Sequence, residues 1–124
     1  MKRILIVGAG AAGLMAAIWA ATPTTEVVIL ERKATPGRKI LISGGGRCNV
    51  LPAELHPDLF TTSSSVNSVK NILASWSLAA QKQFFEETLG IPLKLEAESD
   101  KYFPVSDRAS DILDGLRNEA LRRG

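Results

Sequence analysis

The chain has 124 residues, of which 45% are hydrophobic and 23% are charged, a composition typical of one globular domain with a single core. Fifteen Lys and Arg residues against thirteen Asp and Glu residues give a formal net charge of +2, and aromatic residues make up only 6%. This balance argues against a nucleic acid or an anionic membrane surface as partner. One cysteine, Cys48, excludes a disulfide within the chain and favours a cytoplasmic location.

The first apolar stretch, residues 3–21, carries no charge after Arg3 and has the length of a signal peptide or a membrane span. It lacks a small-x-small cleavage site where it ends, and three glycines interrupt its first half. Residues 4–7 are instead typical of a parallel strand buried on both faces. The alanine-rich segment from Ala11 onward is typical of a helix. We therefore predict a strand, a glycine turn and a helix.

The turn carries the spacing G-x-G-x-x-G at Gly8, Gly10 and Gly13. The first glycine permits the turn, the second lets the backbone approach a pyrophosphate, and the third allows close packing of helix on strand. A second expected strand, residues 27–30, leads into Glu31, at the offset where a carboxylate binds an adenosine ribose. The joint context favours a dinucleotide site over a tight helix–strand contact without ligand. Glu31 would repel a 2′-phosphate, so FAD or NAD is favoured over NADP.

A second glycine-rich segment, "GRKILISGGGRCN", spans residues 37–49. Its apolar residues 40–42 stop at Ser43 and three consecutive glycines, whose backbone adopts conformations closed to other residues. Composition alone leaves a ligand-facing loop and a flexible surface loop equally open. The position of the loop beyond a nucleotide-binding strand favours the ligand-facing interpretation.

Four stretches, "GAGAAGLMAA", "LER", "GRKILISGGGRCNV" and "YFPVSDRA", together resemble the N-terminal region of a bacterial family of FAD-dependent oxidoreductases described as aminoacetone-oxidase-like or bile-acid-dehydro-reductase-like flavoproteins. The resemblance covers nearly the whole chain and implies an α/β, Rossmann-like FAD-binding fold. It also implies a small-molecule substrate, with NAD(P)H as a candidate electron donor. The residues that it places along FAD, the last seven of them near the flavin, are Gly8, Gly10, Ala11, Ala12, Gly13, Glu31, Arg32, Arg38, Lys39, Ser43, Gly44, Gly45, Gly46, Arg47, Cys48 and Asn49.

The resemblance also shows two departures. Family members are several times longer, so we expect an N-terminal portion of the fold with an incomplete sheet, little FAD retention, and self-association through an exposed strand edge. Family members also carry Thr-Asn where this chain has Leu51-Pro52.

No catalytic residue is assigned by the sequence, and no metal site is expected. Cys48 has no second cysteine for dithiol chemistry and is expected to be a small buried residue rather than a thiolate. His56 and the pair Glu86 and Glu87 are interpreted as solvated surface residues. The favoured function is the N-terminal part of an FAD-dependent oxidoreductase. A non-catalytic nucleotide-binding fragment and an NAD-dependent dehydrogenase domain are the alternatives, and the latter leaves the loop at 37–49 without a role.

The second half is expected to be supporting structure, so we divide the chain into residues 1–50, with the β-α-β unit and glycine loop, and residues 51–124, with helices and a hairpin. Residues 61–65 are expected to form a loop and helix cap, followed by helical spacing over residues 66–73. Ser77 is expected to cap a helix through Leu89, stopped by Gly90. Alternation over residues 93–97 predicts a half-buried strand that turns into a second strand at 101–103. Ser106 is expected to cap a last helix whose apolar face comprises Ala109, Ile112, Leu113, Leu116 and Ala120.

Overall fold

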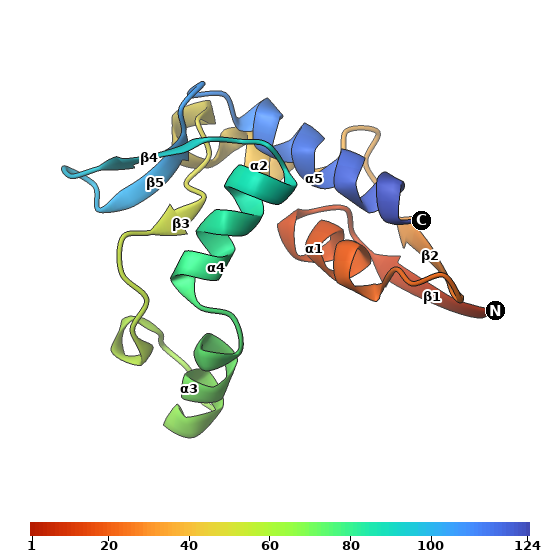
Figure 1. Ribbon diagram of the computed structural model, residues 1–124, viewed down its shortest axis with the longest axis horizontal. Coiled ribbons are helices and arrows are strands. Elements are labelled where there is room, and N and C mark those ends of the chain that lie inside the picture. The colour runs from red at the N-terminus through yellow and green to blue at the C-terminus, as the bar shows by residue number, and fades with distance from the viewer. The chain divides into compact units, whose positions relative to one another are not determined.

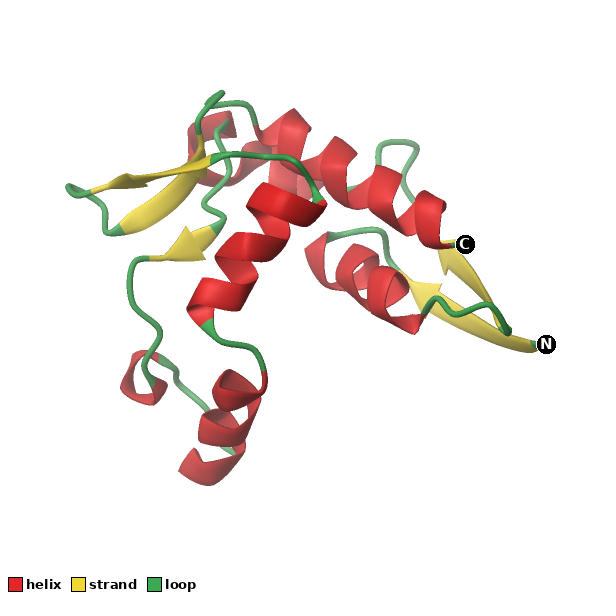
Figure 2. Ribbon diagram, in the orientation of Figure 1, coloured by secondary structure: helices red, strands yellow, loops and turns green.

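The structure is a computed structural model that describes residues 1–124, and these residues form two compact units (Figures 1 and 2). Unit 1 comprises residues 1–48 and 106–124, and unit 2 comprises residues 49–105. The first boundary lies close to the one expected at residue 50. The last helix departs from that division, because it packs within unit 1 instead of with the second half.

Unit 1 begins with β1 (Lys2–Val7), α1 (Ala11–Ala20) and β2 (Thr25–Leu30). The two strands pair in parallel, with Lys2 opposite Thr25 and Val7 opposite Leu30. The predicted strand, glycine turn, helix and second strand are therefore confirmed. No helix in the chain combines the length and the apolar character needed to cross a bilayer.

The β1–β2 sheet is covered on one face only. Helix α1 buries Leu14, Ala17 and Ile18 on its inner side. On β1, the side chains of Leu5 and Val7 are 59% and 86% exposed. The expectation of a strand buried on both faces is therefore wrong for β1, because the crossover helix shields a single face of a two-stranded sheet.

The last helix, α5 (Ala109–Arg123), packs against α1 and against the short helix α2 (Arg38–Ile42). Four of the five residues expected on its apolar face are buried, and Ala120 is half-buried. The expected cap is wrong, since Arg108 is the N-cap residue and makes no side-chain cap. The hydroxyl of Ser106 instead accepts a hydrogen bond from the Arg108 N–H at 3.3 Å, because Ser106 lies two residues before the N-cap position.

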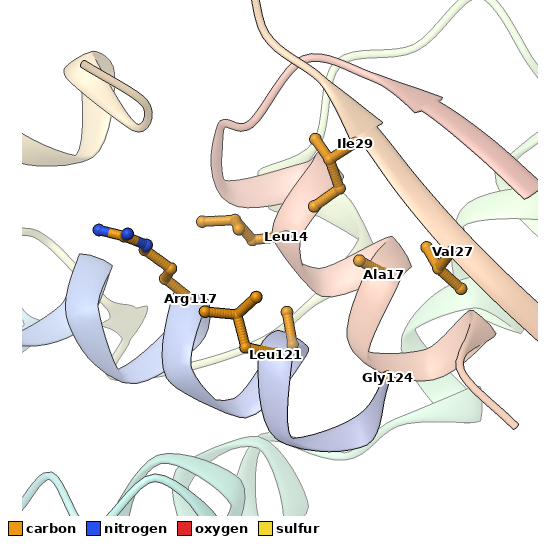
Figure 3. A pocket seen from close by; sticks show the side chains of 8 residues that line it. Leu14, Ala17, Val27, Ile29, Arg117, Leu121 and Gly124 are labelled. Atoms are coloured by element: carbon orange, nitrogen blue, oxygen red, sulfur yellow. The ribbon is translucent and has the colours of Figure 1, made fainter. Parts of the chain in front are cut away.

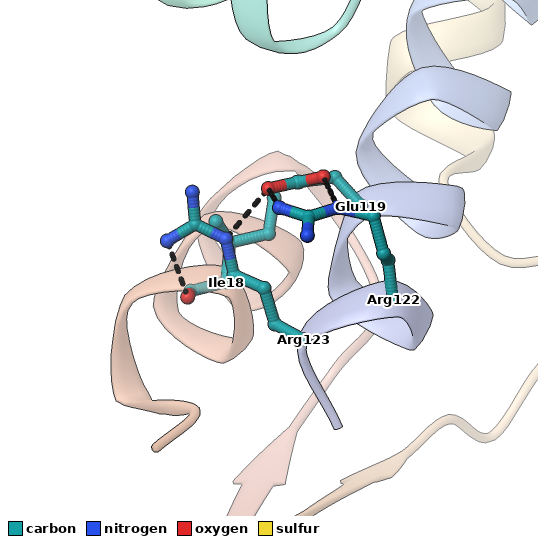
Figure 4. A network of polar contacts seen from close by, with 4 residues as sticks. All are labelled: Ile18, Glu119, Arg122 and Arg123. Atoms are coloured by element: carbon teal, nitrogen blue, oxygen red, sulfur yellow. Dashed lines mark hydrogen bonds and ion pairs between the residues drawn. The ribbon is translucent and has the colours of Figure 1, made fainter. Parts of the chain in front are cut away.

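A charged cluster joins the ends of α5 and α1 (Figure 4). Glu119, only 5% exposed, accepts two hydrogen bonds from Arg122 at 2.7 Å and one from Arg123 Nε at 2.6 Å. Arg123 also donates to the carbonyl of Ile18 in α1 at 3.3 Å and lies 5.3 Å from the centre of the Trp19 ring. The arginine thus satisfies a carbonyl that the end of α1 would otherwise leave without an intrahelical donor.

Unit 2 contains a three-stranded antiparallel sheet in the order β3-β5-β4, formed by β3 (Leu51–Pro52), β4 (Leu93–Glu96) and β5 (Lys101–Pro104). The expected hairpin of β4 and β5 is confirmed, whereas β3 was not predicted. A two-residue strand with a proline carries no periodic signal, and proline is tolerated because β3 lies at an edge. Leu93 is buried but Leu95, nearer the hairpin turn, is 51% exposed, so the half-buried face is shorter than expected.

The helices of unit 2 begin at the expected serine caps. The Ser65 hydroxyl accepts from the Ser68 N–H before α3 (Val66–Ser75), and the Ser77 hydroxyl accepts from the Ala80 N–H before α4 (Leu78–Gln83). A π-helical turn, η3 (Phe84–Thr88), continues α4 to Leu89, and Gly90 follows with a φ of +68°. The expected stop at this glycine is confirmed. A single 3-10 turn, η2 (Pro57–Leu59), precedes α3.

Candidate nucleotide-binding site

The turn between β1 and α1 depends on two of its glycines for its shape. Gly8 has a φ of +97°, and its N–H donates to the Leu30 carbonyl at 2.7 Å, which ties the turn to the end of β2. A β-carbon at Gly13 would collide with the Gly8 carbonyl oxygen and touch Ile6. The fold itself therefore requires the third glycine. This agrees with the expectation that Gly13 allows α1 to pack closely against the turn.

Gly10 is different, because nothing in the protein occupies the space beside it. It is the N-cap residue of α1, in an extended conformation, and no side chain caps the helix. A β-carbon built on Gly10 meets no atom within 4 Å. The following residues, Ala11, Ala12 and Gly13, precede the first helical donor, Leu14, whose N–H bonds the Gly10 carbonyl. Their amides and the open space form a cradle that suits a phosphate group.

Glu31 follows β2 directly and lies beside this turn. Its Oε2 accepts a hydrogen bond from the Ala9 N–H at 2.8 Å, and its Oε1 accepts from the Lys33 N–H at 2.7 Å. These backbone hydrogen bonds hold the pKa of Glu31 below its ordinary value, and the bond from Lys33 has the largest effect. The exposed carboxylate is thus ionised, fixed in orientation, and retains lone pairs for further donors.

A hollow of about 210 Å³ adjoins Glu31 and Ala9. Its remaining walls are Leu14, Ile29, Pro36, Leu113 and Arg117. A second hollow of about 240 Å³ continues between α1, β2 and α5 (Figure 3). There Leu14, Ala17, Val27, Ile29 and Leu121 present aliphatic carbon, so only the first hollow combines apolar walls with a carboxylate.

Basic residues follow Glu31 along the chain. Arg38 and Lys39 occupy the first turn of α2 and are exposed, as is Arg32. Arg38 lines a shallow hollow with Lys33, Ala34 and Thr35. The structure therefore places Arg38 on the same surface as the residues that follow Glu31.

The glycine loop, which we define as residues 43–48, has an unusual backbone. Gly44, Gly45 and Gly46 have φ angles of +56°, +68° and +88°, and Cys48 has +66°. The loop closes on itself through the Cys48 N–H, which donates to the Ser43 carbonyl at 3.0 Å, and the Ser43 hydroxyl donates to the Ile40 carbonyl at 2.9 Å. The segment η1 (Ser43–Gly46) is therefore a compact turn that is kinked at Gly44 and Gly45, whose dihedral angles are left-handed and not helical.

Cys48 is buried, with 6% of its surface exposed. Burial raises the pKa of its thiol, with a smaller opposing effect from a hydrogen bond with Ser43. The expectation of a small buried residue is confirmed. Such a thiol is a poor nucleophile at neutral pH.

Two features of this region were not predicted from the sequence. Arg47 in the glycine loop forms an ion pair with Asp107, 3.1 Å from Nε to Oδ1, although sixty residues separate them. Leu113 and Arg117 of α5 line the hollow beside Glu31. Both contacts form because α5 and the residues just before it pack within unit 1. The only local sequence signal for them is the "YFPVSDRA" stretch, which contains Asp107. Asn49, the last residue of the predicted set, lies in unit 2.

Comparison with known proteins matches residues 2–124 to the model described as the HI0933-like protein Rossmann domain. A 3-dehydro-bile acid delta(4,6)-reductase of Clostridium scindens is 34% identical over 99% of this chain and 30% of its own length. Ribosomal RNA dihydrouridine synthases of Escherichia coli and Haemophilus influenzae are 37% and 36% identical, over 59% and 79% of this chain and 18% and 29% of their own lengths. The chain thus spans at most about a third of these relatives.

Proposed function

Because the chain belongs to the HI0933-like Rossmann-domain family, we propose that it supplies the site for the adenosine and pyrophosphate portion of FAD in a flavoprotein oxidoreductase. The observation that supports this proposal is the hydrogen bond between the glycine turn and Glu31, the two parts of a dinucleotide site. The Glu31 carboxylate bonds the Ala9 amide of the glycine turn, so a ribose on Glu31 and a phosphate at the turn would belong to one ligand.

Each residue type at this site suits one part of that ligand. The open space at Gly10 and the uncapped amides of α1 suit the pyrophosphate, which the positive end of the helix dipole also attracts. The ionised Glu31 suits two ribose hydroxyl donors and would repel a 2′-phosphate, which favours FAD or NAD over NADP. The apolar hollow beside Glu31 suits the adenine ring.

Bound FAD would supply hydride transfer, while the protein supplies binding and orientation. The glycine loop is the candidate contact for the flavin end, and the NAD-dependent alternative gives that loop no task. The relatives are named as a delta(4,6)-reductase of a 3-dehydro-bile acid and as dihydrouridine synthases of ribosomal RNA. We infer from these names a common reaction type, hydrogen addition across a carbon–carbon double bond.

We further propose that the flavoprotein oxidoreductase proposed above acts on a small-molecule substrate. The relative matched over nearly the whole chain is named for a bile acid, which is a small molecule. In addition, fifteen basic against thirteen acidic residues leave an excess of only two cations in this chain, which is little for binding a phosphate backbone.

The ribose contact is tested by Glu31→Gln, which keeps an acceptor for the Ala9 amide but removes the charge. Titration with ADP and with FAD, followed by amide chemical shifts, should show both ligands bound more weakly. Losing charge-assisted hydrogen bonds to the ribose is expected to cost about 1.5 to 3 kcal/mol.

The matched control is Glu26→Gln at the other end of β2, where the carboxylate pairs with Arg3 at 2.6 Å. This variant should bind ADP and FAD as the unchanged chain does. Equal affinities of the Glu31 and Glu26 variants would rule out the proposed site.

A further inference from the structure

The segment that leads into α5 reaches the glycine loop across sixty residues of sequence. Asp107 adopts a φ of +56°, an uncommon conformation for a residue other than glycine, and Ser106 accepts the Arg108 N–H beside it. In this arrangement the Asp107 carboxylate lies 3.1 Å from Nε of Arg47. The pair links "YFPVSDRA" to "SGGGRCN", two stretches that are far apart in the chain.

The glycine loop needs such a restraint. Three consecutive glycines lose more conformational entropy on ordering than any other residues, and all three hold positive φ angles here. Within the loop, the hydrogen bond from the Arg47 N–H to the Gly44 carbonyl is long, at 3.4 Å. The Arg47 N–H is shared between the Gly44 and Ser43 carbonyls, and a side-chain anchor at Arg47 therefore adds a restraint beside this long hydrogen bond.

Helix α5 gives the anchor a fixed base. Its residue Leu113 packs directly on Gly37, the N-cap of α2, where a β-carbon would collide with the leucine. At its other end, Arg123 bonds the Ile18 carbonyl of α1. The same helix thus contacts the element that carries the phosphate turn and the element that leads into the glycine loop.

We propose that Asp107 is a positioning residue that holds the glycine loop, through Arg47, in the conformation that receives the flavin end of FAD. This inference rests on the proposed function. It assigns Asp107 no contact with the cofactor. The affinity for FAD should therefore depend on Asp107, whereas the affinity for ADP, which has no flavin, should not.

The test compares Asp107→Asn with the unchanged chain. Asparagine tolerates the left-handed backbone at least as well as aspartate, so the substitution removes the charge and keeps the turn. The matched control is Asp100→Asn, since Asp100 also has a positive φ, +52°, but lies in the hairpin turn of unit 2. ADP and FAD affinities are measured by amide chemical shifts, and loop order by hydrogen exchange at the Cys48 amide.

In Asp107→Asn we expect the Kd for FAD to rise about two- to fivefold, the effect of one exposed ion pair. The Kd for ADP should not change, and exchange at Cys48 should accelerate by a similar factor while α1 amides are unaffected. Asp107→Asn added to Arg47→Gln should have no further effect, because both remove the same interaction.

An unchanged FAD affinity in Asp107→Asn, or an equal loss of ADP and FAD affinity, would overturn the inference. Glu31→Gln in the same series separates this failure from that of the proposed function. If Glu31→Gln weakens both ligands while Asp107→Asn weakens neither, the nucleotide site stands and only the positioning role fails. If Glu31→Gln weakens neither, the nucleotide site itself fails.

Discussion

Gly10 and Gly13 stand three residues apart in the same turn, and the structure gives each a different reason to be glycine. A side chain at Gly13 would meet the Gly8 carbonyl, which is a constraint of the fold. A side chain at Gly10 would meet nothing in the protein. The fold therefore does not require glycine at this position, and the proposed phosphate contact gives Gly10 a separate reason that can be measured independently.

We predict that Gly13→Ala lowers the free energy of unfolding by about 2 kcal/mol, because a clash of up to about 3 kcal/mol outweighs the better helix propensity of alanine. Gly10→Ala should cost no more than about 1 kcal/mol, as expected for alanine at an N-cap. It should nevertheless abolish most ADP binding, since the β-carbon would displace the phosphate from the amides. Urea unfolding and ADP titration measure the two quantities, with Ala11→Ser as the control that should retain binding. Loss of stability at Gly10 as large as at Gly13 would contradict this division.

The thiol of Cys48 gives a prediction about reactivity. Its pKa is raised by burial and its side chain is largely inaccessible, so alkylation by iodoacetamide at pH 8 should be slow in the folded chain. Alkylation should become rapid in urea, where the thiol is exposed. The rate is followed by mass spectrometry, and similar rates in both conditions would show that Cys48 is a reactive rather than a structural residue.

At the scale of elements, a hydrogen bond joins α5 to α1, and the arginine that donates it is paired with a carboxylate that is almost fully buried. Glu119 lies on the same helix as its two arginine partners, and one of these partners bonds the end of α1. The hydrogen bond from Arg122 is the main cause of a pKa lowered to about 2. The hydrogen bond between the two helices therefore comes from an arginine that an ionised carboxylate holds in place.

We predict that stability falls in acid through this residue. The folded pKa lies below the value of about 4.3 for an unfolded glutamate, so the contribution is complete above that pH and is lost as the pH falls toward about 2. Glu119→Gln should lower the free energy of unfolding at pH 7 by about 1.5 to 3 kcal/mol and flatten its pH dependence below pH 4. Denaturation at a series of pH values measures both. Glu87→Gln, on an exposed surface, is the control and should retain the acid-sensitive slope.

At the scale of the whole molecule, the proposed FAD site consists of the glycine turn, the Glu31 carboxylate and one glycine loop, and the sheet of unit 1 has two parallel strands. A ligand that binds only the folded state stabilises it in proportion to the logarithm of its concentration over Kd. We predict that the 124-residue chain purifies largely without FAD and that added FAD moves its Tm little. Absorbance near 450 nm and thermal melting test this, and one FAD per purified monomer would contradict it.

The exposed face and edges of the β1–β2 sheet lead to a prediction about association. Leu5 and Val7 present apolar surface, and the strands have backbone groups unpaired at both outer edges. We therefore expect concentration-dependent self-association in sedimentation velocity. Val7→Lys should reduce it. Lys101→Glu, a charge change on an exposed residue of unit 2, is the control, and association unaffected by Val7→Lys would assign it to another surface.

The sequence by itself determined the elements whose signals are local. The glycine spacing and the change from β-branched to alanine-rich residues predicted β1, the turn and α1. The offset of Glu31 predicted a ribose contact, whereas its hydrogen bond to the Ala9 N–H, 22 residues away, was not predicted. Ser65, Ser77 and Gly90 predicted helix ends, because a cap is formed by residues within a few positions of each other. In each case the interaction joins neighbours in the chain, so its pattern is visible in one short stretch.

Only the tertiary structure decided which of these elements meet. The return of α5 to unit 1, the pairing of β3 with β5, and the ion pair between Arg47 and Asp107 join residues far apart in sequence. The open face at Leu5 and Val7 was equally invisible, because an apolar run has the same pattern whether one face of its sheet is covered or both. Distant contacts are selected by how whole surfaces pack, and a single sequence leaves no periodic trace of that choice.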